Sequence, residues 1–173
     1  DYVQWSIDVP MLFIHRDDKY LNCRGRSFRE FMTEGWNGHR ANLGDFVLHL
    51  STLFPDVRLK QHLEVRAADM GDRNSILTLS ALHVGLLYDE TALERGLALF
   101  EGLGHAEWSA LRRQVTTTGL ATPFRGGALG DLGNTLVELA IDGLSRWEPG
   151  TERFLTELHR QLGTGLCPAD TTR

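Results

Sequence analysis

The sequence lacks the features of several common protein classes. Its two cysteines, Cys23 and Cys167, are too few and too far apart for a disulfide framework or a zinc site. No apolar run is long enough to span a membrane. No basic patch interleaved with aromatic residues occurs, and the formal net charge of −5 argues against nucleic acid as the main partner. We therefore expect a protein of the reducing cytoplasm, with neither a nucleic-acid nor a membrane partner.

Internal repeats and low-complexity segments are also absent, so no composition change marks a second domain. The 173 residues, 42% of them hydrophobic, suffice for one domain with a packed core. The first residue is Asp1 rather than Met, and apolar residues follow at once, as in the middle of a domain. We therefore expect residues 1–173 to be a single-domain fragment: a piece, a processed product or one half of a split protein.

The front half is expected to contain short strands and helices. Apolar residues 11–15 and 20–23 flank the polar turn 16–19, which predicts a β-hairpin. Ser27, followed three residues later by Glu30, matches a capping box that opens a short helix. Periodicity and alternation predict two further elements: a helix over residues 45–54 and a strand over residues 60–69.

The back half is expected to be helical. Apolar residues cover most of the circumference of a helix predicted from Ser75, its N-cap, to about residue 88, so that helix should be buried. Thr91 is expected to cap the next helix. Further helices are predicted over residues 106–115 and 129–147, and again after Thr151. The fold class is therefore α+β, with antiparallel strands in the front half and helices behind.

Residues 60–69 combine an apolar alternation with a row of ionic groups. Leu63 and Val65 should face a core, because successive side chains of a strand point to opposite faces. An exposed face of an ordinary sheet has the same pattern, so the alternation alone leaves the function open. The opposite face would carry the ionic groups: Lys60, His62, Glu64 and Arg66.

The segment HLSTLFPDVRLKQHLEVRAAD (residues 49–69) resembles the glutamate–cysteine ligases of plants and bacteria. The segments YVQWSIDVPMLFIHRDDKYLNC (residues 2–23) and TTGLATPFRGG (residues 117–127) resemble further parts of that family. These enzymes in turn resemble glutamine synthetase. The resemblance therefore implies the C-terminal part of a glutamine synthetase-like catalytic domain.

The same resemblance implies roles for the ionic row. In the family pattern Glu-x-Arg, the Glu binds a divalent metal and the Arg meets the substrate carboxylate or the transferred phosphate. Carried over, Glu64 would be a magnesium ligand and Arg66 the catalytic clamp on an anion. Magnesium prefers hard carboxylate oxygens, and guanidinium matches oxyanions in a bidentate fork. Lys60 and His62 would assist the binding of substrate and ATP.

The implied activity is the ATP-dependent joining of the γ-carboxylate of L-glutamate to L-cysteine through a γ-glutamyl phosphate, the first step of glutathione synthesis. The family's N-terminal half, which carries further carboxylate ligands of the metal, is not in this chain. We therefore expect the chain alone to be an inactive, partial site. Two alternatives stay open: a non-catalytic scaffold or binding domain of the same fold, and a carboxylate–amine ligase with a different amine.

Arg125 is a further candidate for binding substrate or ATP. It precedes a predicted helix N-terminus, where free amides and the helix dipole favour an anion. The alternative, which the residues favour, is that Gly126 and Gly127 simply permit a tight turn.

Overall fold

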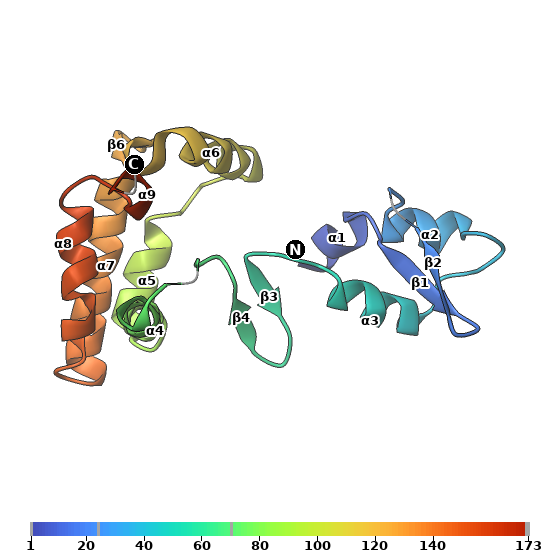
Figure 1. The fold of residues 1–173 in the computed structure, drawn as a ribbon, viewed down its shortest axis with the longest axis horizontal. Helices are drawn as coiled ribbons and strands as arrows, with labels where there is room; N and C mark the ends of the chain where they lie inside the picture. The colour runs from blue at the N-terminus through green and yellow to red at the C-terminus, as the bar shows by residue number, and fades with distance from the viewer. Residues whose placement is uncertain (1, 24, 70, 172–173) are drawn as a thin grey trace. The chain divides into compact units, whose positions relative to one another are not determined.

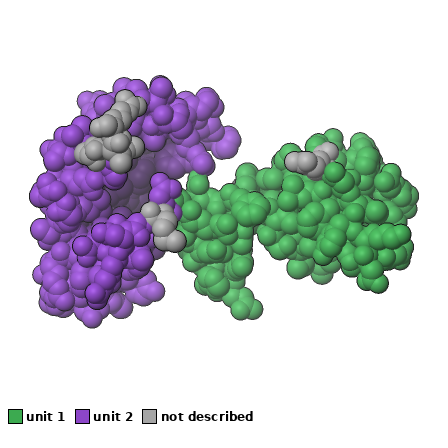
Figure 2. All heavy atoms as spheres, in the orientation of Figure 1, with its two compact units in different colours: residues 1–67 green, residues 68–173 purple. Residues whose placement is uncertain are grey.

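The computed structural model describes residues 2–23, 25–69 and 71–171. The chain divides into two compact units, residues 1–67 and residues 68–173, which Figure 2 shows in green and purple. Each unit has its own cluster of buried apolar side chains. The expectation that residues 1–173 belong to a single domain of a longer protein stays a prediction.

The first unit opens with a helix, a hairpin and two more helices (Figure 1): α1 (Tyr2–Asp8), β1 (Phe13–Arg16), β2 (Lys19–Asn22), α2 (Phe28–Glu34) and α3 (Leu43–Ser51). The predicted hairpin is confirmed, since β1 and β2 pair antiparallel. Its turn has two residues rather than four. Asp17 and Asp18 both have positive φ, 47° and 58°, the conformation that matches the twist of a tight hairpin.

Both α2 and α3 begin at capping boxes. The amide of Glu30 donates to Ser27 Oγ at 3.2 Å and the amide of Ser27 donates to Glu30 Oε2 at 2.7 Å, which confirms the predicted cap. Helix α3 begins before the predicted residue 45, because Asn42 caps it and the Asp45 carboxylate completes the box. The core of this unit consists of Ile7, Met11, Ile14, Cys23, Phe28 and Phe31.

The predicted strand over residues 60–69 is instead a second hairpin. Strand β3 (Val57–Leu59) pairs antiparallel with β4 (Leu63–Val65). Lys60 and His62 lie in the connecting turn, where the Lys60 amide donates to the His62 carbonyl at 2.9 Å. The pattern that predicted one long strand therefore spans a turn as well.

The prediction that Leu63 and Val65 face a core is wrong. Their exposed fractions are 64% and 42%, and across the hairpin Val57 and Leu59 are 45% and 55% exposed. The core cluster of the described part of this unit is built from residues 7–31, and the hairpin strands contribute no side chain to it. The alternation is present, but its apolar side chains are not part of the core cluster of this unit.

The second unit is helical, with short irregular pieces between the helices (Figure 1). Its helices are α4 (Arg73–Leu87), α5 (Glu90–Ala98), α6 (His105–Thr118), α7 (Leu129–Trp147), α8 (Thr156–Leu162) and α9 (Pro168–Thr171). The 3₁₀ turns are Gly119–Ala121 and Glu152–Leu155, and a minimal hairpin joins β5 (Pro123–Phe124) to β6 (Gly127–Ala128). Within residues 2–23, 25–69 and 71–171, no helix is long and apolar enough to cross a membrane.

Helix α4 packs closely along α7 through small residues. A Cβ at Gly85 would overlap the backbone of Ala140, and a Cβ at Gly143 would overlap the backbone of Gly85. The prediction that α4 is buried around most of its circumference is wrong, because neighbours cover only part of it. Three of its apolar side chains remain 56%, 37% and 47% exposed: Ile76, Leu79 and Leu87.

Two predicted helix starts are displaced along the chain. Asp72 rather than Ser75 caps α4, and Asp89 rather than Thr91 caps α5. Each carboxylate accepts the amide three residues on at 2.8 Å, as a capping hydroxyl would. Helix α7 has the predicted bounds. The α+β class is confirmed, with two antiparallel hairpins in the first unit and helices dominating the second.

Candidate functional site

Glu64 and Arg66 share one face of the second hairpin, as the alternation predicts. Arg66 Nη1 donates to Glu64 Oε1 at 3.1 Å. Two more cations approach Oε2 of the same carboxylate: Arg58 Nη1 at 3.6 Å and Lys60 Nζ at 3.9 Å. The Glu64 side chain is 34% exposed. A single carboxylate is therefore surrounded by three cationic groups at the solvent boundary.

Arg58 comes from the neighbouring strand, directly opposite Glu64 in the register of β3 and β4. Its side chain is only 11% exposed, and its Nη2 donates to the Leu53 carbonyl at 2.8 Å. The sequence analysis missed Arg58. The signal that could have found it was its position between Val57 and Leu59, an apolar–polar–apolar alternation like that around Glu64.

Phe54 lies beneath the two arginines. The Cζ atoms of Arg58 and Arg66 are 5.8 Å and 5.4 Å from the centre of its ring, within the range of cation–π attraction. Phe54 as a whole is 74% exposed. We call these five residues the hairpin cluster: Phe54, Arg58, Lys60, Glu64 and Arg66.

Lys60 and His62 differ from the prediction in how they reach the site. Both come from the turn rather than from the face of one long strand. Lys60 still approaches Glu64 from there, whereas His62 is exposed to solvent. Their roles in binding substrate or ATP stay predictions.

The residues around Glu64 do not by themselves fit magnesium. Within the described residues, no group of three or more His, Cys, Asp or Glu side chains could hold a metal ion. The groups nearest to Glu64 are cations, which would repel Mg²⁺ and compete for the same carboxylate. Magnesium takes six ligands from oxygen atoms and uses one or two carboxylates with phosphates. The hairpin cluster therefore presents one carboxylate, and the described residues hold no complete metal site.

Arg125 lies in the turn between β5 and β6, with a positive φ of 46°. Its guanidinium donates to the backbone carbonyl of Glu101 and lies 5.6 Å from the ring centre of Phe124. At the following start of α7, Asp131 Oδ2 accepts the Ala128 amide at 2.8 Å and so already supplies a negative group. These contacts suit a structural turn, and the proposed anion contact of Arg125 stays a prediction.

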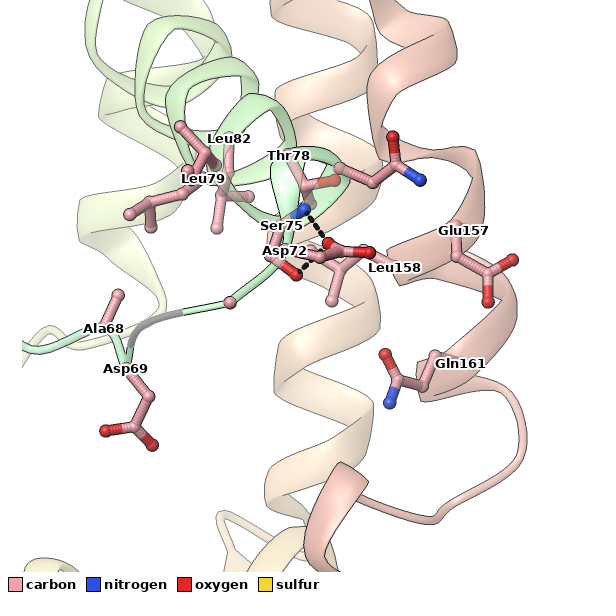
Figure 3. Close-up of a pocket in the computed structure, with 13 residues that line it drawn as sticks. Ala68, Asp69, Asp72, Ser75, Thr78, Leu79, Leu82, Glu157, Leu158 and Gln161 are labelled. Carbon is pink, nitrogen blue, oxygen red and sulfur yellow. Dashed lines mark hydrogen bonds between the residues drawn. The ribbon is translucent and has the colours of Figure 1, made fainter. Parts of the chain in front are cut away.

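A large cavity of the second unit, about 1050 Å³, opens at the start of α4 (Figure 3). Asp72 lines this cavity, and its Oδ1 accepts hydrogen bonds from the amide and the hydroxyl of Ser75, both at 2.8 Å. Glu157 is paired with Arg160. None of the residues predicted to act on substrate, ATP or metal lines this cavity. Its lining combines apolar and acidic side chains, including Ile76, Leu79, Leu82, Leu158, Asp69, Asp72 and Glu157.

Fold and site together define an α+β protein with a charged hairpin in its first unit and a helical second unit. Comparison with known proteins is more specific: the family model of glutamate-cysteine ligase family 2 (GCS2) matches residues 1–173, so the chain belongs to that family. It is 41% identical over 172 residues to the chloroplastic glutamate–cysteine ligase of Nicotiana tabacum. It is equally similar to glutamate–cysteine ligase A of Oryza sativa subsp. indica and to the Medicago truncatula ligase, at 41% each. Each match covers 98% of this chain but only 33–35% of the relative, so the chain spans about a third of their length.

The prediction of a cytoplasmic location is wrong on this comparison, because the plant relatives are all named chloroplastic. The prediction rested on the scarcity of cysteine. Few cysteines indicate that disulfides do not hold the fold together, and this says nothing about which reducing compartment contains the protein.

Proposed function

We propose that this chain is the C-terminal part of an ATP-dependent ligase that joins the γ-carboxylate of L-glutamate to L-cysteine, the first step of glutathione synthesis. The observation that carries the proposal is the pairing of Glu64 and Arg66 on one hairpin face, in a chain of glutamate-cysteine ligase family 2. The names of the plant relatives include both proposed substrates, glutamate and cysteine.

The proposed chemistry needs groups that hold oxyanions. A γ-carboxylate oxygen of glutamate attacks the γ-phosphorus of ATP, and ADP leaves. The cysteine amine then attacks the acyl carbon of the γ-glutamyl phosphate, phosphate leaves, and the amine loses a proton. Arg66 would hold the phosphoryl or carboxylate oxygens through two parallel hydrogen bonds, with Lys60 and His62 adding positive field and Arg125 as a further candidate contact.

Magnesium is proposed as the cofactor of the longer protein, with Glu64 as one of its ligands. Held by Glu64 and by further carboxylates, such an ion would neutralise charge on a phosphoryl group. Because the described residues complete no such site, the other carboxylates would have to come from a part of the longer protein that this chain does not include. For the same reason we propose that the isolated chain is inactive.

The test compares the full-length protein with this chain in an assay of phosphate release from ATP with L-glutamate and L-cysteine. We expect γ-glutamylcysteine from the full-length protein and no release by the chain alone. Hydroxylamine in place of cysteine should trap the acyl phosphate as γ-glutamyl hydroxamate. No product from the full-length protein with either nucleophile would exclude the proposal.

The same assay separates the two alternatives. Turnover with another amine but not with cysteine would identify a related carboxylate–amine ligase. If no amine supports ATP cleavage, the protein is a scaffold that keeps the fold without the reaction.

A further inference from the structure

The surroundings of Arg58 assign this residue to the site. We infer that Arg58, together with Arg66 and Lys60, binds phosphoryl oxygens of ATP. The inference rests on the proposed function and adds to the same site a residue that the sequence pattern did not single out.

The Arg58 guanidinium is short of hydrogen-bond partners. Its side chain is 11% exposed, so 89% of it is buried. Its Nε–H is also buried and has no hydrogen-bond partner among the residues that the structure describes. Nη2 is used on the Leu53 carbonyl, whereas Nη1 lies 3.6 Å from Glu64, which is longer than a hydrogen bond. Arginine has five N–H donors, and buried donors without acceptors are costly. A ligand with several acceptor oxygens would supply further acceptors to the two Nη atoms.

The charge of the hairpin cluster indicates which kind of ligand fits. Three cations, Arg58, Lys60 and Arg66, surround the one carboxylate of Glu64, which leaves a net charge of about +2 when all four are ionised. A terminal phosphoryl group carries a charge of about −2 near neutral pH, whereas a carboxylate carries about −1. The cluster therefore matches a phosphoryl group better than the carboxylate of glutamate.

The two arginines are held in place before any ligand binds. Both guanidinium groups lie over the ring of Phe54, at 5.8 Å and 5.4 Å, and both pair with Glu64. Arg58 is in β3 and Arg66 directly follows β4, where its amide donates to the Asp56 carbonyl at 2.7 Å, so the hairpin backbone fixes their spacing. Donors that are ordered in advance lose less conformational entropy when an anion binds. Glu64 reduces the mutual repulsion of the cations and so keeps them close together.

The test measures binding, so it does not depend on turnover. Titration calorimetry on the full-length protein gives the dissociation constants of ATP, pyrophosphate and L-glutamate for wild type, Arg58→Gln and Arg58→Lys. The matched control is Arg29→Gln, because Arg29 is an exposed arginine of the same unit that pairs with Asp8 at 2.6 Å, outside the hairpin cluster.

We expect Arg58→Gln to weaken ATP and pyrophosphate about tenfold or more, the effect of losing a charge-assisted hydrogen bond. Arg58→Lys keeps the charge without the fork and should lose less. The affinity for L-glutamate, and all three affinities of Arg29→Gln, should stay at the wild-type values.

Unchanged binding of ATP and pyrophosphate in Arg58→Gln would overturn the inference. Weakened L-glutamate binding with unchanged ATP binding would also overturn it, because Arg58 would then serve a carboxylate. If Arg58→Gln does not fold, Arg58→Lys decides, and wild-type pyrophosphate affinity in that variant would count against the inference. Failure of the proposed function looks different: the wild type would bind pyrophosphate through the cluster but form no γ-glutamylcysteine.

Discussion

Replacing Gly85 by alanine should destabilise the helical unit, although alanine is the better helix former. Gly85 lies in α4 where this helix meets α7, and a Cβ there would overlap the carbonyl oxygen of Ala140. It would also lie 2.8 Å and 2.9 Å from the carbonyl carbon and Cα of Ala140. All three are backbone atoms, so no side-chain rotation relieves the overlap, and the two helices must move apart.

The expected size follows from two opposing contributions. Alanine in place of glycine within a helix normally stabilises by roughly 0.5–1 kcal/mol. Overpacking costs about 1–3 kcal/mol, and a clash with backbone on both helices belongs at the upper end. The net loss should be about 2 kcal/mol in the free energy of unfolding. For a unit of this size that lowers the melting temperature by roughly 10 °C.

Thermal unfolding followed by circular dichroism measures this effect, with Gly96→Ala as the matched control. Gly96 is a buried glycine of α5, and its added Cβ would meet only Leu136 Cδ2 at 4.0 Å, an ordinary contact. The control should melt at or slightly above the wild-type temperature. If Gly85→Ala melts no lower than Gly96→Ala, α4 and α7 do not approach each other closely at Gly85 and Ala140.

Three further predictions concern charge and pH. In the full-length protein, Glu64→Gln should slow γ-glutamylcysteine formation about a hundredfold or more, as expected for a ligand of the reaction's metal. The free energy of unfolding should change by less than about 1 kcal/mol, because the ion pairs are partly exposed; normal turnover would remove Glu64 from the site. Burial holds the pKa of His49 below its usual value of 6.5, while its Nε2 lies 2.8 Å from the Ser6 carbonyl. Below about pH 6.5 the unfolded chain therefore binds more protons than the folded chain. The stability that comes from neutral His49 should be fully present above that pH and decrease below it. His49→Gln should remove this dependence of the melting temperature on pH. The hydrogen bond from Arg146, with a further one from the Ala92 amide, lowers the pKa of Asp89 from 3.8 to about 2. The stability that comes from ionised Asp89 should be fully present above pH 3.8 and disappear as the pH falls towards 2. In an acid titration, Asp89→Asn should therefore lose less stability over that window than wild type. Equal losses would refute this role of Asp89.

Local features of the fold could be predicted from the sequence because they depend on residues a few positions apart. The capping box of Ser27 and Glu30 involves a spacing of three, and helix α7 follows from an apolar stripe that repeats over residues 129–147. Caps were less certain where several capping residues lie close together. Asp72 and Ser75 both suit an N-cap, and only the backbone conformation shows that Asp72 is used.

The shared face of Glu64 and Arg66 also follows from sequence, since strand geometry alone places residues two apart on one side. The length of that strand does not follow, because the residues of a hairpin turn can continue the polar–apolar alternation. Lys60 and His62 continue it here, although they lie in the turn.

By itself, the sequence determined the α+β class, most of the elements, and the Glu-x-Arg pair with its resemblance to glutamate–cysteine ligases. Only the tertiary structure decided which residues surround Glu64, because Arg58 arrives from the partner strand through the register of the hairpin. Only the tertiary structure showed that Leu63 is exposed, since burial depends on what packs against a face and not on the alternation that creates it. The close approach of α4 and α7 at Gly85 has the same origin. The sequence does not show why a helix has a glycine at a given position; the backbone that packs against Gly85 does.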